Sequence, residues 1–339
     1  MARKPGSEPM PEHVRPMLAR LGKLPVGDDS GWGYEIKWDG VRALAYVDGG
    51  KARLESRSLE LITPRYPELA GLGEALAGCS CVLDGEIVAL DDAGSPSFQL
   101  LQQRMGLSNK ATIERRAGER PVTYMAFDLL HLNGADTMGL AYEQRRALLA
   151  KLELDGARWQ APAHHVGDGK ALLEVARRQN LEGIVGKRLD SCYHPGRRTG
   201  EWVRVRNRPG QELVIGGWTP GEGARAGSFG ALLVGYFDAT PEQAAERGEP
   251  AKLMYAGGVG TGYTDRELAR LKKLLNARKR ETSPFEPSKA IPKKGALFCE
   301  PELVCEVEYT EWTKENTLRQ PAYKGLREDK PAHDVVREG

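Results

Sequence analysis

A lysine within an apolar stretch, at residues 35–42, is the feature of this sequence best suited to covalent chemistry. The segment reads Glu-Ile-Lys-Trp-Asp-Gly-Val-Arg, which places Lys37 two residues after Glu35 and five before Arg42. A charged ammonium on an apolar strand costs free energy unless the charge is used, and an amine that has lost its proton is a nucleophile. The same pattern also fits a strand that ends in an Asp-Gly turn beside a solvated lysine. Lys37 is therefore a candidate nucleophile that needs support from the rest of the chain.

Downstream segments supply that support, because they combine single polar residues with apolar, β-branched runs. They are residues 56–57, 84–88, 124–128, 182–187 and 202–206. Their order and spacing after Lys37 resemble the covalent nucleotidyltransferases, and the chain resembles the ATP-dependent DNA ligases in particular.

The second half of the chain narrows the resemblance to the ligase domain of the bacterial end-joining ligase, which works with Ku. The similar segments there are residues 212–218, 303–307 and 325–331. Altogether the resemblance extends from about Pro16 to Ala332.

The resemblance implies a reaction in three steps and the molecules that take part in it. AMP passes from ATP to Lys37, then to the 5′-phosphate of nicked or broken duplex DNA, and the adjacent 3′-hydroxyl finally seals the break. Mg²⁺ or Mn²⁺ is the implied metal. The expected role is DNA repair by non-homologous end joining, with Ku as a candidate partner, and we expect a monomer.

The resemblance also assigns residues to the nucleotide. Glu35 matches a contact to the adenine edge, and the ring of Phe127 matches one that stacks on the base. Arg42 and Arg57 match contacts to sugar and phosphate, where a forked donor suits oxyanions. The full set of implied nucleotide-binding residues is Glu35, Ile36, Lys37, Arg42, Arg57, Glu86, Phe127, Lys187, Arg204, Arg206, Arg327, Asp329 and Lys330.

Glu86 and Glu182 are the implied metal ligands, with a ribose contact as the other role of Glu86. Each interrupts an apolar strand, where an unpaired carboxylate is costly. Carboxylate oxygens suit Mg²⁺ or Mn²⁺, which neutralise phosphate charge during transfer. A structural salt bridge is the alternative for Glu182.

Arg204 and Arg206 depart from the family pattern, which is Lys-x-Lys at these positions. There the lysines hold the α-phosphate and help to expel pyrophosphate. Arginine keeps the charge but replaces a compact ammonium by a planar fork. We therefore expect nucleotide binding to be retained, while the transfer rate is left open.

Arg327, Asp329 and Lys330 match the last motif of the family. It implies that they move over the ATP site to orient pyrophosphate and then withdraw, which requires a hinge, expected at residues 208–211. A charged surface loop is the alternative reading.

Composition sets the broad class. The chain has 339 residues, of which 28% are charged and 40% hydrophobic, and a net charge of +2, which fits a globular protein of two domains. The five cysteines include no Cys-x-x-Cys pair, which argues against a structural zinc site. There is no run of 18 apolar residues and no apolar signal core, so we expect no membrane span and a cytoplasmic location.

The first domain, expected over residues 1–208, has the patterns of mixed or antiparallel sheets with flanking helices. Strands at 41–47 and 51–57 enclose Asp48-Gly49-Gly50, a hairpin signal that we take to place Arg42 and Arg57 near opposite ends of the pair. Further strands are expected at 81–90 and 122–130, with helices at 142–152 and 170–179, the latter capped by Asp168.

The second domain, expected over residues 209–339, begins at a Pro-Gly breaker. Strands at 213–218, 230–237, 252–259 and 303–309 with one helix at 265–277 predict a small closed barrel of the OB type. From the pattern alone an SH3-like barrel is a competing fold, and the resemblance favours OB. The expected fold class is thus α+β, an adenylation domain followed by an OB-fold domain.

Two other functions fit parts of the sequence. An RNA ligase or a capping-type nucleotidyltransferase shares the lysine chemistry, although residues 212–218 and 305–329 favour a DNA ligase. A non-catalytic OB-fold DNA-binding protein is the second, and the intact segment around Lys37 argues against it, while Arg204 and Arg206 keep it open. A P-loop enzyme is disfavoured, since no Gly-Lys-Ser or Gly-Lys-Thr occurs.

Overall fold

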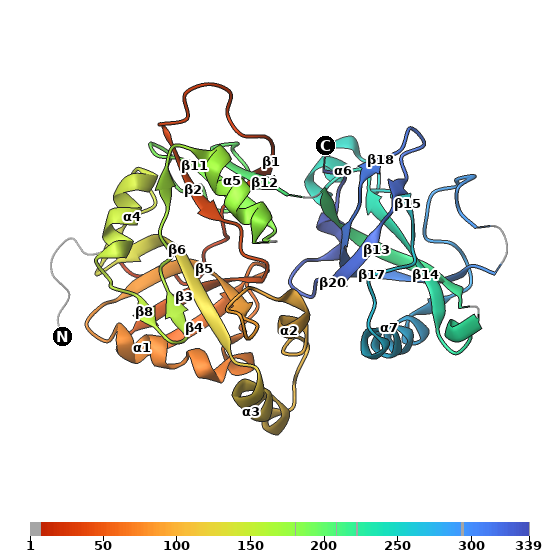
Figure 1. Ribbon diagram of the computed structural model, residues 1–339, viewed down its shortest axis with the longest axis horizontal. Helices are drawn as coiled ribbons and strands as arrows, with labels where there is room; N and C mark the ends of the chain where they lie inside the picture. Colours follow the sequence, from red (N-terminus) through yellow and green to blue (C-terminus); the bar gives the residue numbers. More distant parts are fainter. Residues whose placement is uncertain (1–7, 180, 208, 222, 293–294, 339) are drawn as a thin grey trace. The chain divides into compact units, whose positions relative to one another are not determined.

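The chain divides into two compact units, Met1–Asn207 and Arg208–Gly339 (Figure 1). The structure is a computed structural model, and it describes all residues except 1–7, 180, 208, 222, 293–294 and 339. Mixed sheets flanked by helices confirm the predicted α+β class. Among the described residues, no helix is both long enough and apolar enough to cross a membrane.

The larger sheet of the first unit has the strand order β4-β3-β5-β6-β9-β8, with β7 beside β6. All its pairings are antiparallel except that of β6 with β9. The strands are β3 (Val41–Asp48), β4 (Lys51–Ser56), β5 (Cys81–Ala89), β6 (Val122–Leu132), β7 (Ala135–Asp136), β8 (Asp155–Gly156) and β9 (Trp159–Gln160).

The predicted hairpin of β3 and β4 is confirmed. Gly49 and Gly50 form its turn with φ of +53° and +76°, a left-handed pair of conformations that glycine adopts without strain. The placement of the two arginines was wrong, because Ala43 pairs with Ser56. In an antiparallel pair the first residue of one strand lies beside the last of the other, so Arg42 and Arg57 lie at the same open end.

The smaller sheet of the first unit has the strand order β1-β12-β11-β2-β10. These strands are β1 (Arg20–Leu21), β2 (Trp32–Ile36), β10 (His165–Val166), β11 (Gly183–Arg188) and β12 (Trp202–Arg206). Helix α5 (Gly169–Arg178) packs on β2 and β11, and the Asp168 side chain accepts from the Ala171 amide, as predicted for its cap.

The remaining helices of the first unit surround the larger sheet. They are α1 (Gly71–Ala75), α2 (Phe98–Gln102), α3 (Lys110–Glu119) and α4 (Tyr142–Ala150), with the short turns η1 (Thr63–Arg65) and η2 (Pro67–Leu69). Ala43, Ala45 and Val47 of β3 join the core under these helices. Leu44 and Tyr46 join a second core that also contains Trp202 of β12. Both faces of β3 are therefore buried, which explains its continuous apolar sequence.

The second unit is built on a sheet of order β15-β14-β13-β17-β16, with β20 paired to β17. The strands are β13 (Gly210–Pro220), β14 (Phe229–Phe237), β15 (Leu253–Val259), β16 (Lys279–Arg280), β17 (Leu297–Glu308) and β20 (Ala322–Leu326), besides the separate pair β18 (Glu311–Trp312) and β19 (Leu318–Arg319). Over the described residues the expected closed barrel is not completed as a ladder. A single bridge, between Thr261 and Ala322, joins the end of β15 to β20.

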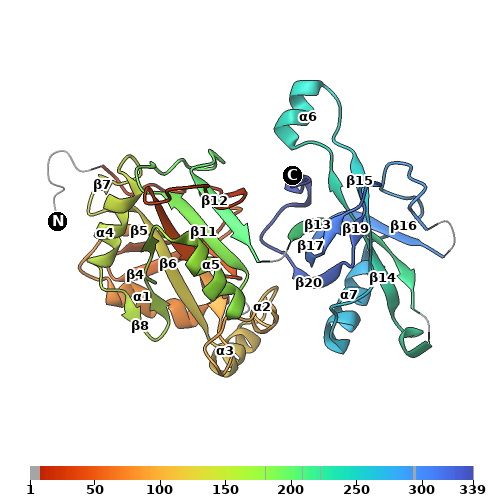
Figure 2. The ribbon, with the colours of Figure 1, turned by 45° about the horizontal axis from the view of Figure 1, so that its top comes forward.

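Two helices accompany this sheet, and they lie at opposite ends of it in Figure 2. The predicted helix is confirmed as α7 (Asp265–Ala277), capped by the Thr264 side chain. The other, α6 (Pro241–Arg247), was not predicted; it buries no residue, so it lacks the apolar stripe by which a helix is recognised. Short turns are η3 (Gly223–Arg225) and η4 (Ala332–Asp334).

Candidate active site

Lys37 follows β2 directly and is held at the edge of the smaller sheet. Its backbone amide donates to the Gly183 carbonyl at 3.0 Å, and its ammonium forms an ion pair with the Glu182 carboxylate. The two side chains are 20% and 18% exposed. The amine therefore lies where a ligand can reach it.

Glu182 connects Lys37 to Arg206. While Lys37 contacts one carboxylate oxygen, Arg206 Nε lies 3.1 Å from the other. Gly183 makes this approach possible, since a Cβ added there would lie 2.1 Å from the Val205 carbonyl oxygen. The structure thus brings together three predicted residues: Lys37 just after β2, Glu182 just before β11 and Arg206 at the end of β12.

Glu35 lies two residues before Lys37, in a buried polar network. Lys187 Nζ is 2.8 Å from one of its carboxylate oxygens. The Tyr142 hydroxyl donates to the other at 2.5 Å, and Arg146 lies 3.8 Å from that same oxygen. The Glu35 side chain is only 8% exposed, so its contact with an adenine stays a prediction.

Lys187 is enclosed by aromatic rings. Its ammonium lies 4.2 Å from the ring centre of Trp202, 4.6 Å from Phe127 and 4.8 Å from Tyr142, distances at which a cation is attracted to a ring face. Burial lowers the pKa of Lys187, and the neighbouring Glu35 opposes that shift. Lys187 Nζ also donates to the Phe127 carbonyl at 3.3 Å. The predicted contact of Lys187 with the nucleotide would therefore be made next to Phe127.

Arg42 is oriented by a buried carboxylate. Its guanidinium donates to both oxygens of Asp84, at 2.5 and 2.6 Å, and the Tyr193 hydroxyl donates to Asp84 at 2.6 Å. Although burial opposes it, the Asp84 charge raises the pKa of Arg42. The guanidinium also lies 4.6 Å from the Phe127 ring centre, so a fork of fixed direction faces the ring assigned to the base.

Glu86 lies next to the lysine segment. It is paired in register with Arg42, and its Cγ would be 2.9 Å from a Cβ added at Gly40. Side chains opposite each other on neighbouring strands share a face. The structure therefore places Glu86 beside Arg42, while its ribose or metal contact stays a prediction.

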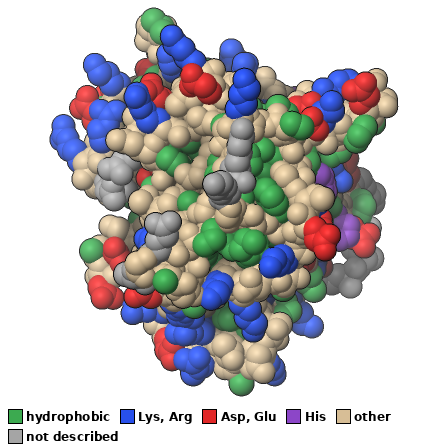
Figure 3. All heavy atoms as spheres, turned by 90° about the vertical axis from the view of Figure 1, so that its right-hand side faces the viewer, with side chains coloured by type: hydrophobic (Ala, Val, Ile, Leu, Met, Phe, Trp, Pro, Cys, Tyr) green, Lys and Arg blue, Asp and Glu red, His purple; other side chains and the backbone are tan. Residues whose placement is uncertain are grey.

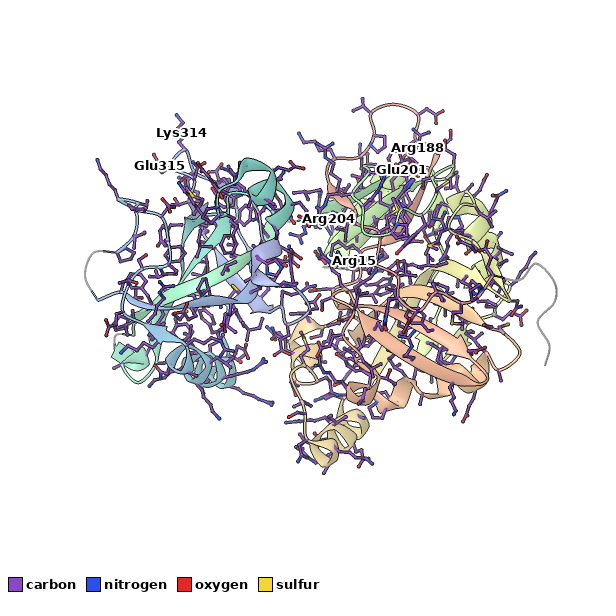
Figure 4. All side chains as sticks on the ribbon, turned by 180° about the vertical axis from the view of Figure 1, so that it is seen from behind. Arg15, Arg188, Glu201, Arg204, Lys314 and Glu315 are labelled. Atoms are coloured by element: carbon purple, nitrogen blue, oxygen red, sulfur yellow. The ribbon has the colours of Figure 1, made fainter. Side chains whose placement is uncertain are left out.

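The other implied residues of this unit differ in how they lie. Arg57 is half-buried just after β4, and Ile36 packs against the apolar cluster of the smaller sheet. Arg204 alternates with Arg206 on β12, so both lie on one face of that strand. In Figure 4, Arg204 and Arg15 lie on one side of the first unit.

A metal ion would depend on few protein ligands. Among the described residues, no three or more His, Cys, Asp or Glu side chains gather closely enough to hold one. Mg²⁺ commonly takes one or two carboxylates and completes its shell with phosphate oxygens and water. Glu182, with its partly exposed carboxylate beside the amine, fits that kind of ligand.

The three implied residues near the C-terminus form a separate cluster in the second unit. The Arg327 guanidinium donates to both oxygens of Asp329 at 3.0 Å, and Lys330 forms an ion pair with Glu212. Their side chains are 14%, 4% and 6% exposed. The reading of Arg327–Lys330 as a solvated surface loop was therefore wrong.

Residues of α4 that no motif suggested also reach the site. Tyr142 and Arg146 contact Glu35, and Arg145 forms a fully buried ion pair with Asp128, next to Phe127. Helical spacing does place Tyr142, Arg145 and Arg146 on one face together with apolar residues. The signal that could have revealed these residues is the presence of arginines on the apolar face of a predicted helix.

Comparison with known proteins gives a family. Residues 16–206 match the model of the ATP dependent DNA ligase domain, and residues 225–330 match that of the ATP dependent DNA ligase C terminal region. The chain is 40% identical to the structure described as mycobacterial DNA ligase D complexed with ATP and MES, with a TM-score of 0.68, over 96% of this chain and 98% of that one. The chain therefore belongs to the ATP-dependent DNA ligases.

Two named relatives are longer proteins. The multifunctional non-homologous end joining DNA repair protein LigD of Mycobacterium tuberculosis is 41% identical over 328 residues, which are 96% of this chain and 40% of that protein. The corresponding protein of Pseudomonas aeruginosa is 36% identical over 98% of this chain and 38% of its own length. The chain thus spans about two fifths of these relatives. The predicted resemblance and the predicted class of enzyme are confirmed, and the RNA ligase, capping and non-catalytic alternatives are not favoured.

Proposed function

We propose that this chain seals breaks in duplex DNA with Lys37 as the residue that carries AMP. The observation behind this is the placement of the Lys37 amine, which is partly exposed, in contact with one oxygen of Glu182, while Arg206 contacts the other. Such an arrangement pairs a nucleophile with a proton acceptor and a fixed cation.

In the first step the Lys37 nitrogen attacks the α-phosphorus of ATP. A nitrogen–phosphorus bond forms, the bond from that phosphorus to pyrophosphate breaks, and the amine proton passes to Glu182 and then to solvent. Arg204 and Arg206 neutralise charge on the phosphates. Bound at Glu182 and Glu86, Mg²⁺ or Mn²⁺ would supply further neutralisation of that charge.

The later steps move the same AMP onward. A DNA 5′-phosphate oxygen attacks the phosphorus on Lys37, which leaves as the amine and regains a proton. The 3′-hydroxyl then attacks the 5′-phosphate, and AMP departs. No additional reactant is required.

The proposed ATP-binding roles are supported by where the side chains lie. Phe127 offers a half-buried ring to the base, with the Lys187 ammonium 4.6 Å from the ring centre, and Glu35 contacts the edge of the adenine. Arg42 and Arg57, at one end of the β3–β4 hairpin, hold sugar and phosphates, and Ile36 contributes next to the nucleophile. Arg327, Asp329 and Lys330 of the second unit act on pyrophosphate in the first step. The hinge predicted at residues 208–211 stays a prediction, since residue 208 lies outside the described residues.

Nicked or broken duplex DNA is the proposed substrate, held mainly through its phosphates. In the basic stretch 272–280, Arg278 lies 3.0 Å from Glu302 and Arg280 lies 3.3 Å from Glu300, while Lys272, Lys273 and Lys279 are exposed and offer positive charge to phosphates. Figure 3 shows basic and acidic side chains together over one face of the molecule. We propose further that the chain acts in end joining, since the named relatives are end-joining proteins. A monomeric state, a cytoplasmic location and Ku as partner belong to the same proposal and rest on the family resemblance.

Intact mass measured after incubation with ATP and Mg²⁺ tests this proposal. We expect a gain of one AMP per chain, which chases onto nicked DNA and disappears when the nick is sealed. GTP in place of ATP is the comparison. No adduct with ATP, or an adduct with GTP alone, would overturn the proposal.

A further inference from the structure

Helix α4 directs three polar side chains into the first unit, and none of them is accounted for by the reaction. Tyr142, Arg145 and Arg146 are all buried. Tyr142 and Arg146 contact Glu35, and Arg146 also donates to the Phe127 carbonyl at 3.3 Å. A single helix therefore supports both residues that are proposed to receive the base.

We infer that Tyr142 is a positioning residue that sets the choice of purine, because its hydroxyl holds the Glu35 carboxylate in one orientation as a hydrogen-bond acceptor. This inference rests on the proposed function, in which Glu35 lies at the edge of the base. It adds a selecting residue that does not itself touch the nucleotide.

The Tyr142 hydroxyl is well placed for this task. It donates to one Glu35 oxygen at 2.5 Å, and its ring is fully buried. His164 packs against the ring with an edge contact, at 5.9 Å between centres, and the Lys187 ammonium lies 4.8 Å from the ring centre. The hydroxyl is thus aimed by contacts on more than one side of the ring.

The second Glu35 oxygen is fixed as well, by Lys187 at 2.8 Å. With a donor on each oxygen, the carboxylate cannot rotate without losing a charge-assisted hydrogen bond. Each oxygen keeps a further lone pair, and an ionised carboxylate only accepts. Such a group matches the amino group of adenine and repels the carbonyl oxygen that guanine has at the same ring position.

Removing the hydroxyl would take away the hydrogen bond at one end of this carboxylate and leave there the longer contact with Arg146, at 3.8 Å. In Tyr142→Phe the oxygen that Tyr142 held would be buried without that donor, while Lys187 would still hold the other. The Glu35 carboxylate could then rotate about its contact with Lys187, or a water that can donate to a guanine oxygen could enter, at a small cost in free energy. Both consequences weaken discrimination between the bases.

The test compares rates of adduct formation with ATP and with GTP in the full chain. For Tyr142→Phe we expect the ratio of kcat/KM for ATP to that for GTP to fall about tenfold, as for loss of one hydrogen bond to a charged group, with most of the change in KM for ATP. Unfolding temperature is recorded alongside.

Tyr193→Phe is the matched control, because the Tyr193 hydroxyl also donates to a buried carboxylate, that of Asp84, at 2.6 Å. Asp84 orients Arg42, which serves the phosphates of either nucleotide. This variant should lower kcat/KM for ATP and GTP by the same factor and leave their ratio unchanged.

An unchanged ratio in folded Tyr142→Phe, or an equal fall in Tyr193→Phe, would overturn the inference. If Tyr142→Phe does not fold, Glu35→Gln decides, since an amide can donate to guanine and should shift the ratio toward GTP; an unaltered ratio there would also refute it. Failure of the wild-type chain to form any adduct would instead refute the proposed function itself.

Discussion

The Lys37 site and the Arg327 cluster both pair cations with carboxylates, yet they do so in opposite proportions. In the first unit, Lys37 and Arg206 both contact the carboxylate of Glu182, and the side chains of Lys37, Glu182 and Arg206 are 20%, 18% and 9% exposed. Among the residues that the structure describes in the second unit, Arg327 and Lys330 lie within 4 Å of three carboxylates, and none of these side chains is more than 14% exposed. The residues of this second cluster are Arg327, Lys330, Glu212, Glu306 and Asp329.

This difference separates a site arranged for an anionic ligand from one that already holds its counter-charges. An excess of positive charge at a partly exposed position attracts phosphates. The Arg327 cluster must exchange carboxylates for pyrophosphate before it can act, which suits a group that is needed in only one step. Substitutions in the two clusters should therefore differ in whether chemistry or stability is lost.

Replacement of Lys37 should have the largest effect on chemistry and little on the fold. In Lys37→Ala no adduct should form with ATP, because no other amine takes its place beside Glu182. The free energy of unfolding should change by less than about 1 kcal/mol, as for a partly exposed ion pair. Intact mass and urea denaturation measure the two effects, and sealing of nicks at the wild-type rate would contradict the mechanism.

Replacement of Arg327 should affect one step more than the others. Loss of a cation that acts on pyrophosphate predicts adduct formation slower by roughly 10²-fold in Arg327→Ala, with a smaller loss in sealing of DNA that already carries AMP. Arg319→Ala is the control, since Arg319 pairs with exposed Glu311 in the same unit. In this variant, adduct formation and the sealing of DNA that already carries AMP should both keep the wild-type rate. Equal losses of both steps in Arg327→Ala would argue against a role confined to the first.

Loss of the negative charge at Glu212 should lower the free energy of unfolding. Glu212→Gln leaves Lys330, 6% exposed, without its carboxylate, and breaking a buried pair in this way costs about 3 kcal/mol. Glu182→Gln in the first unit removes the carboxylate shared by Lys37, 20% exposed, and Arg206, 9% exposed, so we expect a smaller cost, because one of the two cations can still be solvated. Urea denaturation of both variants compares the two clusters directly. Equal losses of unfolding free energy would show that the difference in burial between the clusters does not affect stability.

The sequence predicted these two clusters unevenly. The turn at Gly49-Gly50 and helix α7 depend on local signals, and the lysine segment is short and specific, so all were found. Asp84 and Glu212 stand in predicted motif segments, but their pairing with Arg42 and Lys330 was missed. They lie 42 and 118 residues away from these partners, and periodicity predicts burial but not which charge lies opposite. The buried ion pair of Arg145 and Asp128 was missed for the same reason, because each of these charges can be buried only with the other beside it. Closure of the barrel likewise depends on how β15 and β20 meet, which no local pattern encodes.

The smallest expected effect concerns His164, which packs against Tyr142. Burial, and after it the Arg146 cation, lower the pKa of His164; Glu35 opposes this shift, and Lys187 and His165 add to it. The unfolded chain, with a histidine pKa of about 6.5, then binds the proton more readily than the folded chain. Stability therefore rises with pH between the lowered pKa and about 6.5, and it is lost on acidification through that window. His164→Gln removes this titration, so the variant should lose less unfolding free energy than the wild type between pH 7 and pH 5. Urea denaturation across that range measures how the free energy of unfolding depends on pH. A steeper dependence in the variant than in the wild type would contradict this prediction, because it would mean that the folded chain favours the protonated imidazole.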